Sequence, residues 1–217
     1  MCGRFVQKSP ANQMQSFFDI KGPVPNFGPR YNVAPTQDAA VVVAETDGRR
    51  IELKKWGLIP AWSKEGKAEF ATFNARAESV REKPTYREAF RKRRCIVPAD
   101  GFYEWTGPKG CKVPHLFERR DGALLALAGL HESWRAKDGS ETVNSFTIIV
   151  TAANAWMQSF HDRMPVILEE ADVDAWLSGT PDTAAQLLKS AAPDALQERI
   201  VSKLVNSVKN EGPELVA

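Results

Sequence analysis

The sequence predicts one α+β domain, built on a curved, barrel-like and mostly antiparallel β-sheet with helices at its periphery. Three observations lead to this fold class. Seven segments with the composition of strands dominate the middle of the chain, helix-like segments stand towards both ends, and no repeat, low-complexity tract or linker divides the 217 residues. We therefore expect a single domain over residues 1–217.

The strand-like segments begin with a hairpin. Residues 39–45 and 50–56 are apolar or alternating runs, and the turn Asp47-Gly48 between them predicts that they pair. The stretch 26–35 is rich in Pro, Gly and Asn, which predicts an extended loop. The five further strands are expected at residues 95–99, 102–105, 113–118, 123–130 and 146–151.

Helix signals stand at both ends of the chain. Ser9 and Pro10 predict a helix to residue 18, with serine as its cap and proline in its first turn. Thr180 and Pro181 predict the start of another helix in the same way. The expected helices cover residues 9–18, 84–92, 153–160, 171–177 and 181–190.

Composition excludes several classes of protein. The chain is 43% hydrophobic and 26% charged, which is typical of a soluble globular protein. Its apolar runs are too short to cross a bilayer and no signal peptide opens it, so we expect a cytoplasmic protein without membrane contact. Three cysteines without a CxxC pair, scattered histidines and no phosphate-binding loop predict no disulfide, no metal and no cofactor. Cys95 is expected to be buried in its strand.

Charge is unevenly distributed along the chain. Net charge is only +2, but residues 1–160 hold 24 Lys and Arg against 17 Asp and Glu, whereas residues 161–217 hold 5 against 10. The densest basic block covers residues 81–94. Such a block can bind the phosphates of a nucleic acid by charge and counterion release, and a solvated helix face is the alternative.

The chain opens with a cysteine at position 2. If Met1 is removed, Cys2 presents a free α-amine and a thiol on adjacent carbons, a pair that can capture an aldehyde in a ring. The reference pKa of an α-amine is about 7.7–8.0, so a useful fraction is neutral and nucleophilic near neutral pH. The alternative is a frayed chain end without function.

Four other residues are candidates for chemistry. Glu104 stands between Tyr103 and Trp105, where desolvation would suit a general acid, although an outward strand position is equally compatible. His161 is either a proton carrier or a structural histidine. Asn74 and Arg76 offer an amide and a guanidinium two residues apart; alternatively, Asn74 caps a short helix and Arg76 is solvated.

Two tryptophans flank a segment broken by Gly and Pro. Trp56 is expected in the core. Trp62 is followed by polar residues and is the better surface candidate for stacking on nucleic-acid bases.

Eight sequence blocks in order give the chain a resemblance to a known family. They are MCGRF (1–5), YNVAPTQ (31–37), WGLIPAW (56–62), FNARAES (73–79), RCIVPADGFYEW (94–105), AGLHESW (128–134), TAANAWMQSFHDRMPVIL (151–168), and VN with a later GP (205–213). In these blocks the chain resembles the SRAP family, the SOS response-associated peptidases. Its apparent departures fall in the connecting segments, such as 66–72 and 109–112.

The resemblance implies an abasic-site processing function within the SRAP fold. It implies that Cys2, freed of Met1, forms a covalent thiazolidine cross-link with the aldehyde of an abasic site in single-stranded DNA and so shields the lesion. Glu104 would open the sugar ring, His161 would exchange protons, and Asn74 would position Cys2 and the sugar. Arg4 and Arg76 would contact phosphates, while Trp62 and Pro35 would wedge or stack beside the lesion. We expect a monomer in the bacterial cytosol, associated with the nucleoid when bound to DNA.

Two other functions stay open at this point. The first is a thiol peptidase or autopeptidase that uses Cys2 as an N-terminal nucleophile and removes Met1, although no Cys-His-Asn spacing supports it. The second is a noncovalent binder of damaged or modified DNA. Lyase-type Schiff-base chemistry would accompany the covalent mechanism if the ring closed slowly.

Overall fold

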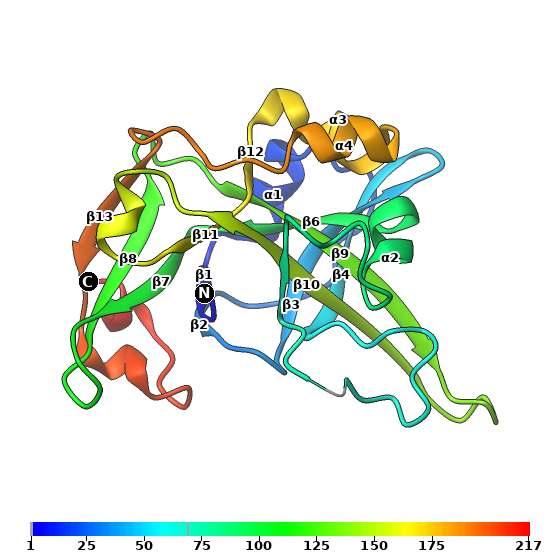
Figure 1. The fold of residues 1–217 in the computed structure, drawn as a ribbon, viewed down its shortest axis with the longest axis horizontal. Coiled ribbons are helices and arrows are strands. Elements are labelled where there is room, and N and C mark those ends of the chain that lie inside the picture. Colours follow the sequence, from blue (N-terminus) through cyan, green and yellow to red (C-terminus); the bar gives the residue numbers. More distant parts are fainter. Residues whose placement is uncertain (1, 69) are drawn as a thin grey trace.

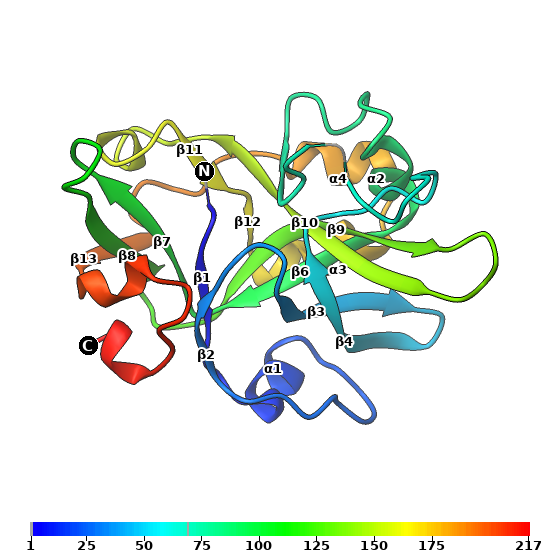
Figure 2. The ribbon, with the colours of Figure 1, turned by 90° about the horizontal axis from the view of Figure 1, so that it is seen from below.

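Five strands of the protein close into a barrel. The computed structural model describes residues 2–68 and 70–217. Each barrel strand pairs with the next and the last returns to the first; every pairing is antiparallel except the parallel pair β10–β4, which confirms the expected curved, mostly antiparallel sheet (Figures 1 and 2). In barrel order the strands are β4 (Gly48–Trp56), β3 (Asp38–Glu45), β6 (Arg94–Ala99), β9 (Leu125–Arg135) and β10 (Thr142–Ala152).

β3, β6 and parts of β9 and β10 bury both faces, which is why they are nearly continuous apolar runs, whereas β4 mixes buried apolar residues with exposed polar ones. In β3, Val41 and Val43 join a cluster shared with the second sheet, while Val42 points the other way into a cluster covered by helices. Alternation of side chains along a strand separates the two clusters. β-Branched residues pack well on such surfaces, so this region is recognisable from sequence.

Three short strands extend the barrel edges. β5 (Asn74–Arg76) runs parallel to β10, next to the end of β4. β11 (Arg163–Pro165) pairs with the end of β10, and β12 (Ile167–Leu168) pairs with β9. The residues that follow β5 and the residues that precede β11 therefore lie together at the C-terminal end of β10.

A second, fully antiparallel sheet lies beside the barrel (Figure 1). Its order is β13-β8-β7-β1-β2, so the N-terminal strand is paired on both edges. Phe5 in β1 is opposite Val33 on one side and Phe102 on the other. The strands are β13 (Leu196–Ile200), β8 (Val113–Arg119), β7 (Gly101–Thr106), β1 (Phe5–Gln7) and β2 (Arg30–Val33).

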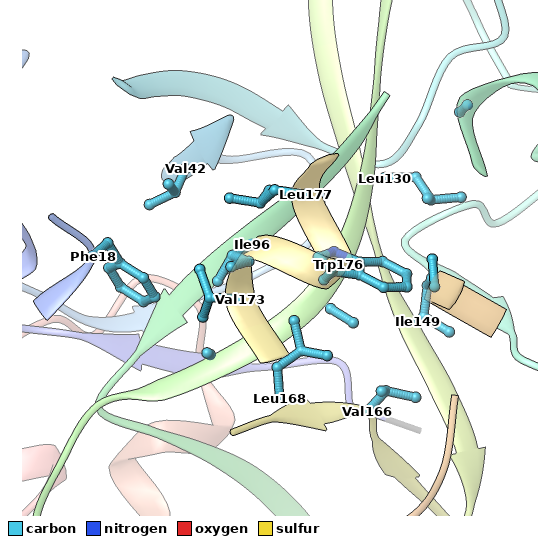
Figure 3. Packing of buried hydrophobic residues seen from close by; sticks show 14 of the residues in the cluster. Phe18, Val42, Ile96, Leu130, Ile149, Val166, Leu168, Val173, Trp176 and Leu177 are labelled. Atoms are coloured by element: carbon cyan, nitrogen blue, oxygen red, sulfur yellow. The ribbon is translucent and has the colours of Figure 1, made fainter. Parts of the chain in front are cut away.

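Short helices cover one face of the barrel sheet. Phe18 follows the first of them, and Trp176 in α3 packs against the ring of Phe90 and donates a hydrogen bond to the Cys95 carbonyl at 2.8 Å (Figure 3). None of the helices in the described ranges is long and apolar enough to cross a membrane. The α-helices are α1 (Ala11–Phe17), α2 (Arg87–Lys92), α3 (Val173–Ser178) and α4 (Pro181–Gln186); the 3-10 helices are η1 (Met157–Ser159), η2 (Glu170–Asp172), η3 (Lys203–Asn206) and η4 (Pro213–Leu215).

The expected helix caps and hairpin turn are partly confirmed. The Thr180 side chain accepts a hydrogen bond from the Thr183 amide, as expected for a cap. Ser9 was wrong as a cap: Pro10 occupies that position, because the Ser9 hydroxyl donates instead to the Asp100 carboxylate at 2.6 Å. The hairpin turn lies one residue earlier than expected, since Glu45 pairs with Gly48.

Other differences concern elements that depend on distant partners. The expected loop 26–35 contains β2, and β13 was not expected at all, because both strands are specified by pairing with β1 and β8. The expected helix 153–160 shortens to the single turn η1. The tryptophan expected in the core, Trp56, is fully buried, and so is Cys95.

Comparing variants of buried Trp176 and exposed Trp62 tests this packing. Truncating buried Trp176 to alanine removes a large side chain from the cluster under the helices and should destabilise the protein by about 3–5 kcal/mol. Trp62 is 58% exposed, so its replacement should change stability by about 0.5 kcal/mol or less. Urea denaturation of both variants measures the difference; equal losses would contradict the assigned packing.

Candidate active site around Cys2

Cys2 is held by the strand that follows it. The Tyr103 amide donates to the Arg4 carbonyl at 2.9 Å, and Phe5 is opposite Phe102. Continuing this antiparallel register places Gly3 opposite Glu104. Cys2 is fully buried in the cluster that contains Phe5, so this end of the described chain is not frayed.

Glu104 lies on the inner face of β7. Phe102, two residues earlier, stacks on Phe117 across the strand pair with ring centroids 5.1 Å apart, and Glu104 is opposite His115 in the same register. Glu104 is 5% exposed, so the alternative of an outward strand position is wrong. Its neighbour Tyr103 points to the other face, where its hydroxyl donates to the Tyr31 carbonyl at 2.8 Å.

The Cys2 thiol and the Glu104 carboxylate are electrostatically coupled. Burial raises the pKa of the Cys2 thiol above its ordinary value, and the negative charge of Glu104 raises it further. The sulfur is therefore a neutral thiol in the resting protein. A proton must leave the sulfur when it acts as a nucleophile.

His161 reaches this region through an aromatic contact. The ring of Phe160 packs on His115 (5.2 Å) and on Phe117 (5.1 Å), the residues opposite Glu104 and Phe102. His161, the residue after Phe160, is therefore held on the side of the β7–β8 pair that carries Glu104. In both ribbon views the segment leading into β1 lies beside β11, which begins two residues after His161 (Figures 1 and 2).

The His161 ring nitrogen Nδ1 has two polar contacts. It accepts a hydrogen bond from the Arg163 amide at 2.9 Å, and it lies 2.8 Å from Asp162 Oδ1. Asp162 is 84% exposed, so an ion pair between the two side chains would be weak. These two contacts fix the orientation of the His161 ring.

Asn74 opens strand β5 and faces the cluster that contains Cys2. It is in parallel register with Ile148, a member of that cluster, while Ala75 faces the cluster under the helices. The helix-cap alternative is therefore wrong. Asn74 Nδ2 donates to the Phe73 carbonyl at 3.1 Å, but within the described residues its buried Oδ1 accepts no hydrogen bond. Leaving such an oxygen unpaired costs about 1–3 kcal/mol, so it is poised to accept from a ligand.

Trp56 connects the Cys2 strand to the Asn74 strand. Its ring packs on Phe5 at 5.0 Å and its Nε1 donates to the Phe73 carbonyl at 2.8 Å. The position of Cys2 relative to Asn74 is thereby fixed through one buried side chain.

Arg76 and Arg163 create positive charge at the edge of the site. Arg163 forms an ion pair with Glu78, which follows the exposed Arg76 by two residues. Partial burial alone would raise the pKa of Glu78, but the hydrogen bond and charge of Arg163, with the charge of Arg76, lower it. One carboxylate thus faces two guanidiniums. Sequence reasoning missed Arg163, whose signal was its position two residues after His161.

Pro35 and Trp62 lie on loops that meet at the end of β4. The Thr36 amide donates to the Trp56 carbonyl at 2.8 Å. Thr36 has a φ of 76°, a conformation strained for a β-branched residue, and such strain commonly occurs at functional sites. Trp62 lines an open hollow of about 420 Å³ together with Phe70 and Lys67.

The remaining basic residues are placed differently. Arg4 Nη1 donates to Asn32 Oδ1 at 2.7 Å and to the Val205 carbonyl at 2.9 Å, and burial lowers its pKa. Its expected contact with DNA stays a prediction. In the block 81–94, Arg94 is buried and donates to the Phe90 carbonyl at 2.7 Å, so it stabilises the fold. Among the described residues no cluster of metal-binding side chains is found.

The three cysteines should differ in reactivity. Cys111 is exposed, whereas Cys2 and Cys95 are buried and burial raises both of their thiol pKa values. Brief treatment of the native 217-residue chain with iodoacetamide near neutral pH should therefore alkylate Cys111 first, and all three cysteines should react in urea. Peptide mass spectrometry measures this; rapid labelling of Cys95 in the native protein would contradict the packing.

Comparison with known proteins places this arrangement in a family. A model described as "SOS response associated peptidase (SRAP)" matches residues 1–208. The chain is 40% identical over 223 residues to the abasic site processing protein YoqW of Bacillus subtilis (strain 168), covering 100% of this chain and 99% of that protein. It is 31% identical over 222 residues to the abasic site processing protein HMCES of Xenopus tropicalis, covering 88% and 66%.

Solved structures agree with the fold. A crystal structure of a protein from Bacteroides thetaiotaomicron superposes with a TM-score of 0.86 at 26% identity, covering 99% of this chain and 98% of that one. A second, from Bordetella bronchiseptica, gives a TM-score of 0.80 at 27% identity, covering 93% and 100%. With the sequence blocks, the barrel and the family model in agreement, the chain belongs to the SRAP family, the SOS response associated peptidases.

Proposed function

We propose that this protein processes abasic sites in single-stranded DNA by capturing their aldehyde on Cys2. The observation that carries the proposal is the placement of Cys2, buried at the start of a strand paired on both edges and electrostatically coupled to Glu104. Relatives named as abasic site processing proteins support it.

The covalent sequence balances as a condensation. Loss of Met1 exposes the α-amine of Cys2. The amine attacks the C1′ aldehyde of the opened sugar and a water molecule leaves, which gives an imine. The thiol then adds to the imine carbon, and its proton passes to the former imine nitrogen. The product is a thiazolidine, formed from aldehyde and aminothiol with release of one water molecule.

Glu104 and His161 supply the proton transfers in this proposal. An abasic deoxyribose rests mainly as a cyclic hemiacetal, so an acid must protonate the ring oxygen as the C1′ hydroxyl loses its proton. Glu104 is buried beside Cys2 and is assigned the acid role. His161 exchanges a proton with the opening sugar and with the imine intermediate.

Asn74 positions the reacting groups. Its unpaired Oδ1 faces the cluster that contains Cys2, so it can accept a hydrogen bond from the Cys2 amine or a sugar hydroxyl. A bond from the Cys2 amine would fix the nucleophile, and a bond from the sugar hydroxyl would satisfy the buried acceptor only when the substrate is present, which favours the bound geometry.

We assign contact with DNA to the two arginines at the edge of the site and to the loops that carry Pro35 and Trp62. Arg76 and Arg163 provide guanidinium groups for phosphates of the backbone. Exposed Trp62, together with Pro35, stacks on the bases that flank the lesion, because an abasic gap leaves them without a neighbour. A single strand suits these contacts, because its bases are accessible for stacking, and we expect the protein to act as a monomer.

Speed of ring closure decides between protection and strand cleavage. An imine left open permits β-elimination of the 3′ phosphate, which is lyase chemistry, whereas the thiazolidine removes the imine. Removal of Met1, by the protein itself or by an aminopeptidase, precedes either outcome.

The central prediction concerns a covalent adduct. Incubation with a single-stranded oligonucleotide that carries one abasic site should give a product stable to boiling in SDS, absent with undamaged DNA and with Cys2→Ala. Cys2→Ser keeps the amine without the sulfur, so borohydride-trapped imine and strand cleavage should increase relative to the stable adduct. A durable adduct formed by Cys2→Ala would refute the proposal.

Glu104→Gln tests the acid. The amide keeps the shape of the side chain but cannot donate a proton to the ring oxygen, so the first-order rate of cross-linking at saturating DNA should fall about 10²–10⁴-fold near neutral pH. Affinity for DNA with a tetrahydrofuran abasic analogue, which has no aldehyde, should stay the same. An unchanged cross-linking rate would remove Glu104 from the mechanism.

A further inference from the structure

The C-terminal segment of the chain closes over the N-terminal strand. Residues 203–215, here called the C-terminal strap, contain η3 and η4 and lie beside the second sheet, near β2 and β8 (Figures 1 and 2). The strap meets the face of β1 opposite to the one carrying Phe5 and the active-site cluster: Val6 packs in a cluster with Val205, whereas Phe5 packs with Cys2.

Asn32 in β2 is the hub of this contact. Its side chain is 0% exposed. Its Nδ2 donates at 2.9 Å to the carbonyls of Ser207 and Asn210, and its Oδ1 accepts from Arg4 Nη1 at 2.7 Å. Both ends of the amide are therefore used, and they join three segments that are far apart in the sequence.

Arg4 follows Cys2 by two residues and connects the N-terminal segment to the strap. The same Nη1 that donates to Asn32 also donates to the Val205 carbonyl at 2.9 Å, and the guanidinium lies 5.7 Å from the centre of the Trp105 ring. Trp105 Nε1 in turn donates to Asn206 Oδ1 at 2.7 Å. Arg4 is thus joined to the strap directly and through its neighbour.

Further contacts close the strap along β2. Glu211 accepts a hydrogen bond from the Tyr31 amide and forms an ion pair with Arg30 at 3.0 Å. Leu215 in η4 is fully buried. These contacts hold the strap in place independently of Arg4, so removing the Arg4 guanidinium need not unfold it.

We propose that Arg4 and Asn32 are positioning residues that anchor the reactive N-terminus to the C-terminal strap. This inference rests on the proposed function for its kinetic consequence. Only three described residues, 2–4, precede Phe5. A chain end moves freely unless contacts hold it in place. Holding the Arg4 side chain in place limits where the amine and thiol of Cys2 can lie relative to Glu104.

The energetic consequence follows from proximity. Misplacing a reacting group by about 1 Å can lower a rate about 10²-fold without changing binding. The anchor should therefore act on the first-order rate of cross-linking at saturating DNA. If Arg4 were instead a phosphate contact, its loss would weaken DNA affinity.

The test compares Arg4→Met, Asn32→Ala, the double variant and the exposed control Lys21→Ala. Cross-linking rate at saturating abasic DNA, affinity for the tetrahydrofuran analogue and melting temperature are measured for each. Both single variants should slow cross-linking about 10-fold or more with affinity unchanged, and the double variant should be no slower than the slower single one, because the two residues form one unit. Arg4→Lys, which can still donate to both acceptors, should recover most of the rate.

Two results of the DNA experiments would overturn the anchor. One is loss of DNA affinity in Arg4→Met while Asn32→Ala keeps a normal rate; the other is additive effects in the double variant. A measurement without DNA separates this inference from the proposed function. Iodoacetamide should alkylate Cys2 faster in Arg4→Met and in Asn32→Ala than in wild type, while Cys95 stays protected in all three. Unchanged alkylation of Cys2 would refute the anchor even if wild type cross-links DNA, and faster alkylation would support it even if wild type does not.

Discussion

The insertion of β1 between β7 and β2 is the constraint on which the site depends. A strand of three residues has little stability of its own, but this one is hydrogen-bonded on both edges and its Phe5 side chain is buried against Trp56. The register with β7 sets which residue lies opposite Gly3, and that residue is Glu104. A shift by one position would turn the carboxylate to the other face and replace it with an aromatic residue.

Burial gives Cys2 its chemical character as well as its place. An exposed aminothiol at a chain end would react with any small aldehyde, whereas burial and the nearby Glu104 charge raise the pKa of the Cys2 thiol and keep it protonated in the resting protein. The surrounding groups come from strands far apart in sequence: Glu104 from β7, Asn74 from β5, and His161 from the segment that packs on β8 through Phe160. Glu104 and His161 are positioned by the β7–β8 pair, whereas Asn74 is linked to β1 through Trp56.

Sequence alone predicted the barrel well and the small strands poorly. Most barrel strands contain apolar runs whose composition is itself the signal, and the polar strand β4 is marked by the hairpin turn that joins it to β3. By contrast, β2 and β13 contain polar residues and exist because β1 and β8 offer them edges. For the site, the residue types were evident but their directions were not. The alternation along β7 could not show which face is inward, so Glu104 stayed ambiguous until Phe102 was seen to stack on Phe117. The contact between Arg4 and Asn32 crosses 28 positions, which no local pattern reports.

In the proposed reaction the N-terminal cysteine is itself the reagent. The measurement that tests it most directly is the intact mass of the purified protein before and after exposure to single-stranded abasic DNA. Before exposure the mass should correspond to the chain without Met1, and afterwards to that chain plus the oligonucleotide less one water molecule, with the adduct mapped to the N-terminal peptide. An unchanged mass after exposure, or an adduct mapped elsewhere in the chain, would contradict the account.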